Sequence, residues 1–447
     1  MKLSAFVKIY PLNGCYAYYH SLKMKPVYLS EFEHRALKNF QYGGLPRDTL
    51  EALIQNRILV EDESDIMETV RRHIPPPYIS LAYFILTEQC NLACRYCFLG
   101  NASQDRKVST YPMSEGIAEV ALKYFAFQTQ QDMEQFEDEK EIIFYGGEPL
   151  INFSTLKFVV LRAEEYMREG IISPNLRFST VTNGLLLDEN KINFFKEHKI
   201  AVSISLDGAT EQDNAARLDK TGKNSFNAVL KKISLANELD FNVGLSVTIT
   251  PNLLKNMEAF IELLQQTRID SICFNILHSV NTFDVSSDYY ARATDFIISF
   301  YEKTKHIPIY EDRFARKLNT FIHGGIYYSD CAATSGSQIV ITPSGEVGIC
   351  HGCLESREFF ITDINSLADL RNNSTFIEWS RLSPIFQEEC LNCEALGICG
   401  GGCPINARNM TSHGTIHSVD RAFCIHSKII LNYLIEKLYN IMEKRLS

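Results

Sequence analysis

The sequence predicts an α/β protein built around a parallel sheet, with the connectivity of a partial (β/α)6 TIM-type barrel. Between residues 79 and 277, six strand-like runs alternate with longer helical patterns, and such alternation is typical of parallel sheets. Cysteine-bearing and polar motifs follow these strands at their carboxyl ends, where barrel enzymes assemble their active sites. The predicted strands are Ser80–Thr87, Glu141–Tyr145, Leu176–Thr182, Ala201–Leu206, Phe241–Thr248 and Asp270–Ile276.

The overall composition is that of an ordinary globular protein. The chain has 447 residues, of which 45% are hydrophobic and 22% are charged. It has no apolar run of membrane-spanning length and no signal-peptide core at its start, so we expect a cytoplasmic protein that does not bind a membrane. The net charge of −10 argues against nucleic acid as a partner. Thirteen cysteines without an export signal indicate metal or redox chemistry.

Residues 1–75 are predicted to form a small domain of their own. Two strand-like runs are joined by Asn13-Gly14, the favoured type I′ hairpin turn, and a third run follows. Two helices and a returning strand complete the domain, and Pro75–Pro77 then forms a stiff linker. The predicted elements are strands at 5–12, 15–20, 26–30 and 58–60, and helices that begin near residues 31 and 48.

The first helix of this domain has a clear start signal. Ser30 and Glu33 are spaced as a capping box, and we expect the helix to bury Phe32, Leu37 and Phe40. The layout of the domain resembles the PqqD-like winged-helix leader-recognition domain of peptide-modifying enzymes. That resemblance implies a domain that holds an extended peptide as an added strand at a sheet edge. The alternative is a generic cap on the catalytic domain.

A cysteine triad follows the first predicted barrel strand. Cys90, Cys94 and Cys97 are spaced C-x₃-C-x₂-C, and three thiolates can hold a [4Fe–4S] cluster whose fourth iron has no protein ligand. S-adenosylmethionine (SAM) commonly fills such an open position. The stretch resembles the signature of the radical SAM superfamily, including Phe98 after the last cysteine. A zinc knuckle is the alternative, but zinc sites usually have four protein ligands.

A second motif follows the second predicted strand. Its residues are Gly146, Gly147, Glu148 and Pro149. The two glycines permit a close approach of the backbone to a ligand, and the carboxylate can receive an ammonium group. The motif resembles the GGEP motif of the same superfamily, which implies that it holds the amino group of SAM.

Polar residues at the ends of later strands are further candidates for SAM contacts. Asn183, Ser205 and Asp207 suit the ribose hydroxyls and the carboxylate of SAM. Arg217, expected in a helical segment, is placed to pair with that carboxylate bidentately. Tyr96, inside the cysteine signature, completes the set that the resemblance implies. The alternative for each is a loop residue that satisfies local backbone groups.

A second group of cysteines begins at Cys331. Seven of them match the SPASM pattern that closes many radical SAM maturases: Cys331, Cys350, Cys390, Cys393, Cys399, Cys403 and Cys424. The resemblance implies two auxiliary [4Fe–4S] clusters, and so three clusters in all. The outer one would be ligated by Cys390, Cys393, Cys399 and Cys424, and the inner one by Cys331, Cys350 and Cys403. Whether Cys353 is the fourth inner ligand stays open, and a zinc-ribbon array is the alternative.

His351, directly after the second SPASM cysteine, is a candidate catalytic residue. Sulfatase-maturating relatives carry an aspartate there that acts as a base, whereas several thioether-forming maturases carry a histidine. The replacement counts against sulfatase maturation without excluding it. A hydrogen bond to cluster sulfur is the alternative role for this side chain.

Together these features resemble a radical SAM/SPASM maturase of ribosomally made peptides. The expected domains are 1–75 for leader recognition, 76–277 for the barrel, 278–330 for a helical bridge and 331–447 for SPASM. The resemblance implies that a 5′-deoxyadenosyl radical removes hydrogen from the peptide, which then closes a thioether or carbon–carbon crosslink. The expected partners are a precursor peptide with a leader and an electron donor such as flavodoxin or ferredoxin. Sulfatase maturation and a zinc-binding interaction protein are the alternatives.

Overall fold

The computed structural model describes two compact units, each assembled from separate segments of the chain. Unit 1 comprises Met1–Pro75, Arg313–Cys331 and Arg381–Ser447, and unit 2 comprises Pro76–Asp312 and Ala332–Ser380. Within these segments the described residues are 1–97, 99, 111–131, 133–277 and 285–446. Phe98, a predicted SAM contact, lies outside them.

Unit 2 is organised by one sheet of ten strands in the order β12-β11-β10-β9-β8-β7-β6-β13-β14-β15. Strands β6 to β11 are the six predicted barrel strands, all parallel, and each begins and ends within two residues of its predicted limits. Their bounds are β6 Leu81–Thr87, β7 Lys140–Gly146, β8 Leu176–Thr182, β9 Ala201–Ser205, β10 Val243–Ile249 and β11 Ile269–Ile276. The predicted α/β fold with a large parallel sheet is therefore confirmed.

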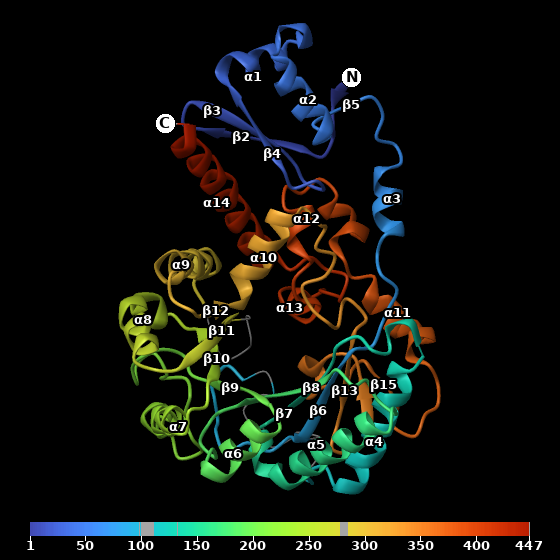
Figure 1. The fold of residues 1–447 in the computed structure, drawn as a ribbon, viewed down its shortest axis with the longest axis vertical. Helices are drawn as coiled ribbons and strands as arrows, with labels where there is room; N and C mark the ends of the chain where they lie inside the picture. The colour runs from blue at the N-terminus through green and yellow to red at the C-terminus, as the bar shows by residue number, and fades with distance from the viewer. Residues whose placement is uncertain (98, 100–110, 132, 278–284, 447) are drawn as a thin grey trace. The chain divides into compact units, whose positions relative to one another are not determined.

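Helices follow the strands of this sheet and lie along its outer side (Figure 1). Each carries an apolar face into the core; α5, for example, buries Leu156, Val159, Val160 and Ala163. The inner strands alternate buried and less buried side chains, as β7 and β8 do. The helix bounds are α4 Glu115–Thr129, α5 Phe153–Arg168, α6 Glu189–Glu197, α7 Phe226–Glu238, α8 Met257–Gln265, α9 Tyr289–Thr304 and α11 Ser374–Ser380.

The sheet continues beyond both ends of the predicted barrel. β12 (Tyr310–Glu311) adds in parallel to β11, and β13 (Gln338–Ile341) pairs in parallel with β6. β14 (Glu346–Gly348) and β15 (Phe360–Asp363) then extend the sheet in antiparallel fashion. The chain around Cys350 is thus built onto the same sheet as the cysteine triad.

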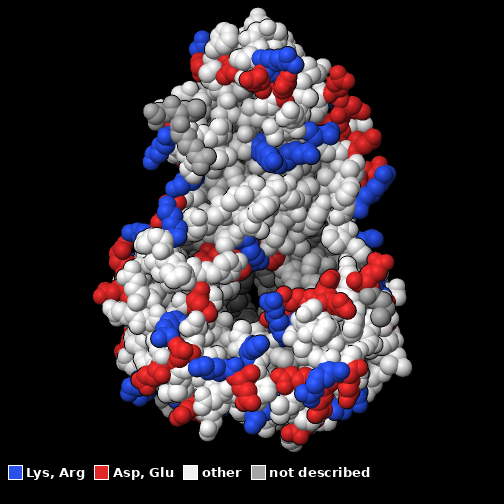
Figure 2. All heavy atoms as spheres, in the orientation of Figure 1, with Lys and Arg blue, Asp and Glu red and all other residues white. Residues whose placement is uncertain are grey.

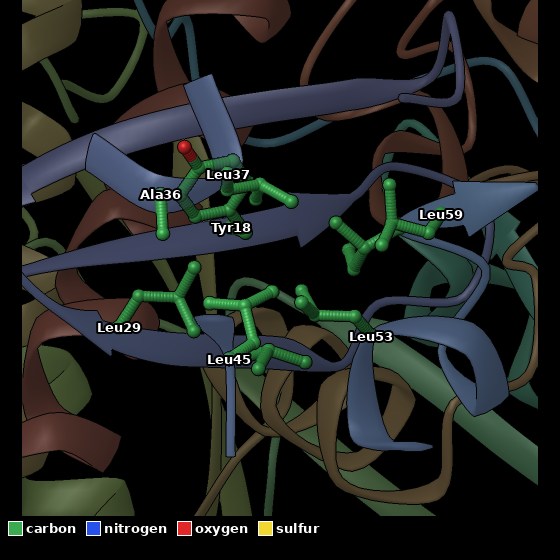
Figure 3. Packing of buried hydrophobic residues seen from close by; sticks show 9 residues of the cluster. Tyr18, Leu29, Ala36, Leu37, Leu45, Leu53 and Leu59 are labelled. Carbon is green, nitrogen blue, oxygen red and sulfur yellow. The ribbon is translucent and has the colours of Figure 1, made fainter. Parts of the chain in front are cut away.

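The N-terminal part of unit 1 contains a three-stranded antiparallel sheet, β2 (Val7–Leu12), β3 (Cys15–His20) and β4 (Pro26–Ser30). Side chains from this sheet and its two helices pack into one apolar cluster, including Tyr18, Leu29, Leu37, Leu45 and Leu53 (Figure 3). The remaining elements are α1 Glu31–Lys38, α2 Arg47–Gln55, α3 Ile66–Arg72 and the small sheet of β1 Lys2–Leu3 with β5 Leu59–Val60.

Helix α1 starts as predicted but buries a different face. Ser30 and Glu33 form the predicted capping box, and Leu37 is buried. Phe32 and Phe40 were expected to be buried too, and that prediction is wrong: they are 68% and 72% exposed. Phe32 is five residues before Leu37, which places it about 140° away around the helix. Phe40 follows the helix C-cap with a positive φ of 58°, which turns its side chain out of the core.

The C-terminal part of unit 1 consists mainly of helices. Their bounds are α10 Asp312–His323, α12 Leu396–Cys399, α13 Pro404–Asn409 and α14 Arg421–Leu446. Leu22 from the N-terminal part packs with Ile385 and Leu396, so both ends of the chain contribute to one core. In the part of the chain that the structure describes, no helix is long and apolar enough to span a membrane. The face in Figure 2 carries basic and acidic side chains side by side.

Candidate functional site

The cysteine triad lies in the loop that leaves the carboxyl end of β6. The GGEP turn follows the neighbouring β7 and is bonded to this loop: the Gly147 N–H donates to Thr87 O and the Glu148 N–H to Gln89 O, both at 2.9 Å. A Cβ on Gly146 would lie 2.1 Å from Thr87 O, and one on Gly147 would lie 2.2 Å from Gln89 O. These glycines therefore allow a close approach of the turn to the backbone of the cysteine loop.

Glu148 is 1% exposed and held by three hydrogen bonds. Its Oε1 accepts from Thr182 Oγ1 at 2.7 Å and from the Leu150 N–H at 3.0 Å, and its Oε2 accepts from the Asn183 N–H at 2.7 Å. Burial raises the pKa of this carboxyl group. A carboxylate has about four acceptor positions, so this arrangement leaves room for one further donor. Pro149 is buried and starts the short helix that follows.

Asn183 follows β8 and Ser205 ends β9, and among the described residues the first of these two predicted SAM contacts is the one that hydrogen-bonds to the cysteine loop. Asn183 reaches the cysteine loop, donating to Asn91 Oδ1 at 2.7 Å and lying 3.8 Å from Cys90 Sγ. Ser205 is half-buried at the end of β9. Of these two, the structure brings Asn183 against the triad.

Tyr96, Asp207 and Arg217 form one hydrogen-bonded group beside Cys94. The Tyr96 hydroxyl donates to Asp207 Oδ2 and accepts from Arg217 Nη1 at 2.8 Å, while Asp207 Oδ1 accepts from the Thr248 N–H at 3.0 Å. Asp207 is 0% and Arg217 6% exposed. Burial, with a smaller contribution from Asp207, raises the pKa of Cys94 to about 11, and Arg217 opposes this. Asp207 thus acts on the loop through Tyr96.

The segment that carries Arg217, whose N–H donates to Asn214 O at 2.9 Å, consists of turns followed by a short bridge and is not the helix that was expected. It pairs with the cysteine loop, since the Ala93 N–H donates to Leu218 O at 2.7 Å and the Arg95 N–H to Ala216 O at 2.9 Å. This pairing fixes the guanidinium next to the triad.

A second connection to the loop comes from the segment after Cys350, and the sequence analysis did not predict it. Arg357 forms a buried ion pair with Glu88, which precedes the triad, and its Nε lies 3.2 Å from Glu346 Oε2. The two partners are 269 residues apart in the chain. Cys97 packs with Val340 and Leu354 in one apolar cluster. The start of the SPASM-like region therefore braces the cysteine triad.

His351 lies against two aromatic rings of the sheet. Its ring centroid is 4.5 Å from that of Tyr83 on β6 and 5.3 Å from that of Tyr145 on β7. Burial lowers the pKa of His351 to about 4, so the imidazole is neutral near pH 7. The same burial makes this imidazole a weaker proton acceptor than a free histidine side chain.

Four of the SPASM-type cysteines face one another within unit 1. Burial, together with the neighbouring thiols, raises the pKa values of Cys390 and Cys424 to about 12 and also raises that of Cys393. Ser427 Oγ donates to Cys399 Sγ at 3.4 Å. Within the described residues, no three or more His, Cys, Asp or Glu side chains are positioned to hold a single metal ion. The donor set of clustered, partly buried thiols fits an iron–sulfur cluster, whose metal charge would deprotonate them.

The cysteines predicted for the inner cluster are divided between the units. Cys331 and Cys403 belong to unit 1, and Cys350 and Cys353 to unit 2. The Cys350 and Cys353 thiols are both buried and hydrogen-bonded to each other. Cys403 is fixed by its N–H, which donates to Asp420 Oδ2 at 3.0 Å.

Comparison with known proteins decides the family. The family model described as the Radical SAM superfamily matches residues 84–267, a range that contains the triad, the GGEP turn and the polar strand ends. The protein is a radical SAM enzyme. The predicted relationship is confirmed, and with it a [4Fe–4S] cluster and SAM as cofactors. A non-catalytic zinc-binding protein, the alternative named above, is not supported by this match.

The relatives of this radical SAM enzyme include peptide- and protein-modifying enzymes. It is 25% identical over 389 residues to the radical SAM cyclopropyl synthase TigE of Paramaledivibacter caminithermalis, which covers 81% of this chain and 75% of TigE. It is 24% identical over 347 residues to a cysteine-type anaerobic sulfatase-maturating enzyme of Clostridium perfringens, covering 73% of this chain and 89% of the relative.

Two solved structures share the fold of this radical SAM enzyme. Native anSMEcpe with bound AdoMet aligns with a TM-score of 0.68 at 20% identity, over 81% of this chain and 99% of that one. Streptococcus suis SuiB bound to the precursor peptide SuiA aligns with a TM-score of 0.56 at 14% identity, over 95% of this chain and 99% of SuiB. Because the alignment with SuiB covers 95% of this chain, it includes at least part of residues 1–75.

Proposed function

We propose that this enzyme forms a crosslink, a thioether or a carbon–carbon bond, within a ribosomally made precursor peptide. The observation that carries the proposal is the fold likeness over 95% of the chain to SuiB, which was solved with its precursor peptide. The likeness in sequence to a cyclopropyl synthase supports the same class of reaction. A crosslink removes two hydrogens from the peptide and retains its sulfur.

The residues around the triad are suited to hold SAM. When bound, the cluster and SAM supply a 5′-deoxyadenosyl radical, which removes a hydrogen atom from a substrate carbon. Cys90, Cys94 and Cys97 would hold the cluster. Glu148 would accept the SAM ammonium at its remaining position, and Arg217, fixed through Tyr96, would pair with the SAM carboxylate. Burial of these groups strengthens both contacts.

We assign the remaining cysteines to two auxiliary clusters, three clusters in all. The mutual approach of Cys390, Cys393, Cys399 and Cys424 supports the outer one. The hydrogen-bonded thiols of Cys350 and Cys353 support a shared role of both in the inner one, with Cys331 and Cys403. We also assign to His351, whose ring lies against Tyr83 and Tyr145, the role of taking the proton that the peptide loses on crosslinking.

We place the leader peptide at the free edge of β4. The Ser30 N–H donates to Glu33 at 2.8 Å and so points away from β3. Outward and inward groups alternate along an antiparallel strand, so the Tyr28 N–H and C=O also face outward, while Pro26 has no N–H to offer. Phe32, at the start of α1 directly after β4, adds an exposed apolar side chain to this edge. An extended peptide would pair with Tyr28 and cover Phe32.

The leader site is tested with two phenylalanine variants of the full-length enzyme. F32A is expected to weaken binding of the precursor peptide about tenfold or more, since it removes a large apolar contact. F40A is the matched control, because Phe40 is as exposed as Phe32 but follows the other end of α1. Isothermal titration of both variants with the precursor measures the difference. Equal affinities in wild type and F32A would refute this placement.

The reaction itself is tested by mass spectrometry. The enzyme, reconstituted with iron and sulfide under anaerobic conditions, is incubated with SAM, dithionite and short cysteine-bearing peptides encoded near its gene. A product that has lost two hydrogens and kept its sulfur, with a new bond located by fragmentation, supports the proposal. A peptide cysteine converted to an aldehyde with loss of sulfur would refute it.

Sulfatase maturation is the second candidate. The 24% identity over 347 residues to a cysteine-type anaerobic sulfatase-maturating enzyme favours it. His351 argues against it, because the family resemblance described above implies an aspartate at that place in sulfatase-maturating enzymes. The same mass spectra decide, if a peptide with a sulfatase-type cysteine is included as a substrate.

A further inference from the structure

Three cations on one face of α10 surround a single carboxylate in unit 1. Lys317 Nζ donates to Asp330 Oδ1 at 3.0 Å, and the guanidinium groups of Arg313 and Arg316 lie 3.9 and 3.7 Å from the same carboxylate. Spacings of three and four residues bring the three cations to one side of the helix. The group retains a net charge of two positive after Asp330 is counted.

The most buried of these cations touches the turn that carries an outer-cluster cysteine. Lys317 is 1% exposed, and its Nζ donates to Cys399 O at 2.5 Å. The same ammonium lies 4.4 Å from the ring centroid of Tyr327 and 4.9 Å from that of Phe423, the neighbour of Cys424. The approach is close because Gly400 follows Cys399 with φ +77°, and a Cβ there would lie 2.7 Å from the Asp330 backbone nitrogen.

The other charges near these cysteines are two ion pairs and the buried carboxylate of Asp420, which accepts from the Phe423 N–H at 3.2 Å. Arg421 pairs with Glu389, and Lys428 pairs with Glu394. Both pairs are much more exposed than Lys317, so water screens them. The uncompensated positive charge on this side of the cysteines therefore comes from α10.

A [4Fe–4S] cluster with four thiolates needs such compensation. Four thiolates and a core of charge 2+ carry a net charge of two negative, and a buried charge is costly unless opposite charge lies close to it. One-electron reduction takes the cluster to three negative, with no bond broken and no proton moved. Nearby positive charge stabilises the reduced form more than the oxidised form, and so raises the reduction potential.

We propose that Arg313, Arg316 and Lys317 compensate the charge of the outer auxiliary cluster and set its reduction potential. The inference rests on the proposed assignment of Cys390, Cys393, Cys399 and Cys424 to that cluster. In the proposed crosslinking, the peptide loses one hydrogen atom and then one electron and one proton. A cluster with a raised potential is a suitable acceptor for that electron.

The test is a redox titration with opposite charge changes. The full-length protein carries Cys90, Cys94 and Cys97 all changed to Ala, which leaves only auxiliary clusters, and dithionite-poised samples are followed by EPR. K317M removes one positive charge and is expected to lower one midpoint by about 59 mV, tenfold in the ratio of reduced to oxidised cluster. D330N removes the negative charge and is expected to raise the same midpoint. The double variant K317M/D330N should return close to the starting value.

Two controls identify the cause and the cluster. K140M removes another fully buried lysine, which lies in unit 2 and hydrogen-bonds to Gln135 O at 2.7 Å; its midpoints should not move. The signal that shifts in K317M should be lost in C424A, since it belongs to the outer cluster. If K317M fails to retain its iron, D330N still keeps all three cations and remains measurable.

The proposal is overturned by unmoved midpoints in D330N, by shifts of K317M and D330N in the same direction, or by a shifted signal that survives in C424A. A triple-cysteine variant without any auxiliary iron would instead refute the outer cluster itself. That result is distinct from a cluster that is present with an unaltered potential.

Discussion

Apart from the Glu88–Arg357 ion pair, the loop of Cys90, Cys94 and Cys97 lies beside two buried carboxylates and one guanidinium, whereas Cys399 lies beside three cations and one carboxylate. In the first region, Glu148 and Asp207 outnumber Arg217, and burial raises the pKa values of both carboxyl groups. In the second, Lys317 is bonded to the backbone of the cysteine turn itself. Both regions contain partly buried cysteines, but the charges set around them have opposite signs.

The contrast corresponds to the two tasks that we propose for these regions. SAM carries a sulfonium, an ammonium and a carboxylate, so it is a net cation, and surroundings with a net negative charge and an unfilled acceptor position suit its binding. A closed cluster binds no substrate and needs only a stable charge state. Surrounding cations supply that stability. The sign of the neighbouring charge therefore separates the site that receives a ligand from the one that moves electrons.

The largest expected effect is the loss of SAM cleavage, which should depend on the first region and leave the second unchanged. Changing Cys90, Cys94 and Cys97 together to Ala should abolish reductive cleavage of SAM, because no ligands for its cluster remain, while auxiliary iron is retained. Deoxyadenosine measured by liquid chromatography and iron counted per chain provide the readouts. C15A, in a buried position on β3, is the control and should change neither. Deoxyadenosine production by the triple variant would disprove the assignment of the first cluster.

The next effect concerns the shape of the first region without touching its charges. G147A would place a methyl carbon 2.2 Å from Gln89 O, a backbone atom that cannot swing aside. We expect a loss of SAM affinity and cleavage corresponding to about 3 kcal/mol or more. G43A is the matched control, since a Cβ there meets nothing within 4 Å. Equal SAM cleavage by G147A and G43A would contradict the tight packing of this turn.

A smaller effect is expected at Cys353, which tests whether the inner cluster resembles the closed or the open type. If Cys353 is its fourth ligand, C353A should lose up to about a third of the iron or show altered inner-cluster EPR signals without peptide. Unchanged iron and spectra, with a wild-type signal that shifts when a cysteine-bearing peptide is added, would indicate an open iron that binds the substrate thiolate instead.

The smallest expected effect concerns the stability of unit 1 in acid, which depends on the buried side chain of His20. Burial, reinforced by Arg57, lowers the pKa of His20 from 6.5 to about 4. The folded state therefore favours neutral His20. This preference contributes about 3 kcal/mol to the free energy of unfolding. The contribution is complete above pH 6.5 and is lost as the pH falls toward 4. H20N keeps an acceptor for the Leu22 and Lys23 N–H groups. The thermal unfolding midpoint of H20N should fall less than that of wild type when the pH is lowered from 7 to 5. An equal fall of both midpoints would argue against this role of His20.

The parallel strands and the capped start of α1 were predictable because their signals are local. Alternating hydrophobic patterns located β6 to β11 within two residues, and the Ser30–Glu33 spacing located the start of α1. The close spacing of the triad and its distance to the GGEP turn indicated the family that the comparison confirms.

Contacts between distant segments were not predictable in the same way. β13 is only four residues long and pairs with β6 from far along the chain, so nothing in its own sequence announces a barrel strand. The Glu88–Arg357 ion pair is equally non-local. Arg313, Arg316 and Lys317 form a charged helical pattern that by itself indicates a solvated face. Their burial depends on Asp330 and the turn after Cys399, which only the folded unit brings together.

Unit 1 is completed by segments from the two ends of the chain, and this affects the order in which the protein is made. Leu22 packs against Leu396, and the Gly397 N–H donates to Ser21 O at 2.9 Å. During translation the N-terminal sheet emerges early, yet this face of it stays uncovered until nearly the whole polypeptide has left the ribosome. The outer cysteines lie in that late segment. Under the proposed assignment, iron would be loaded there only after translation, and a chain truncated before Cys390 would expose apolar surface to chaperones and proteases.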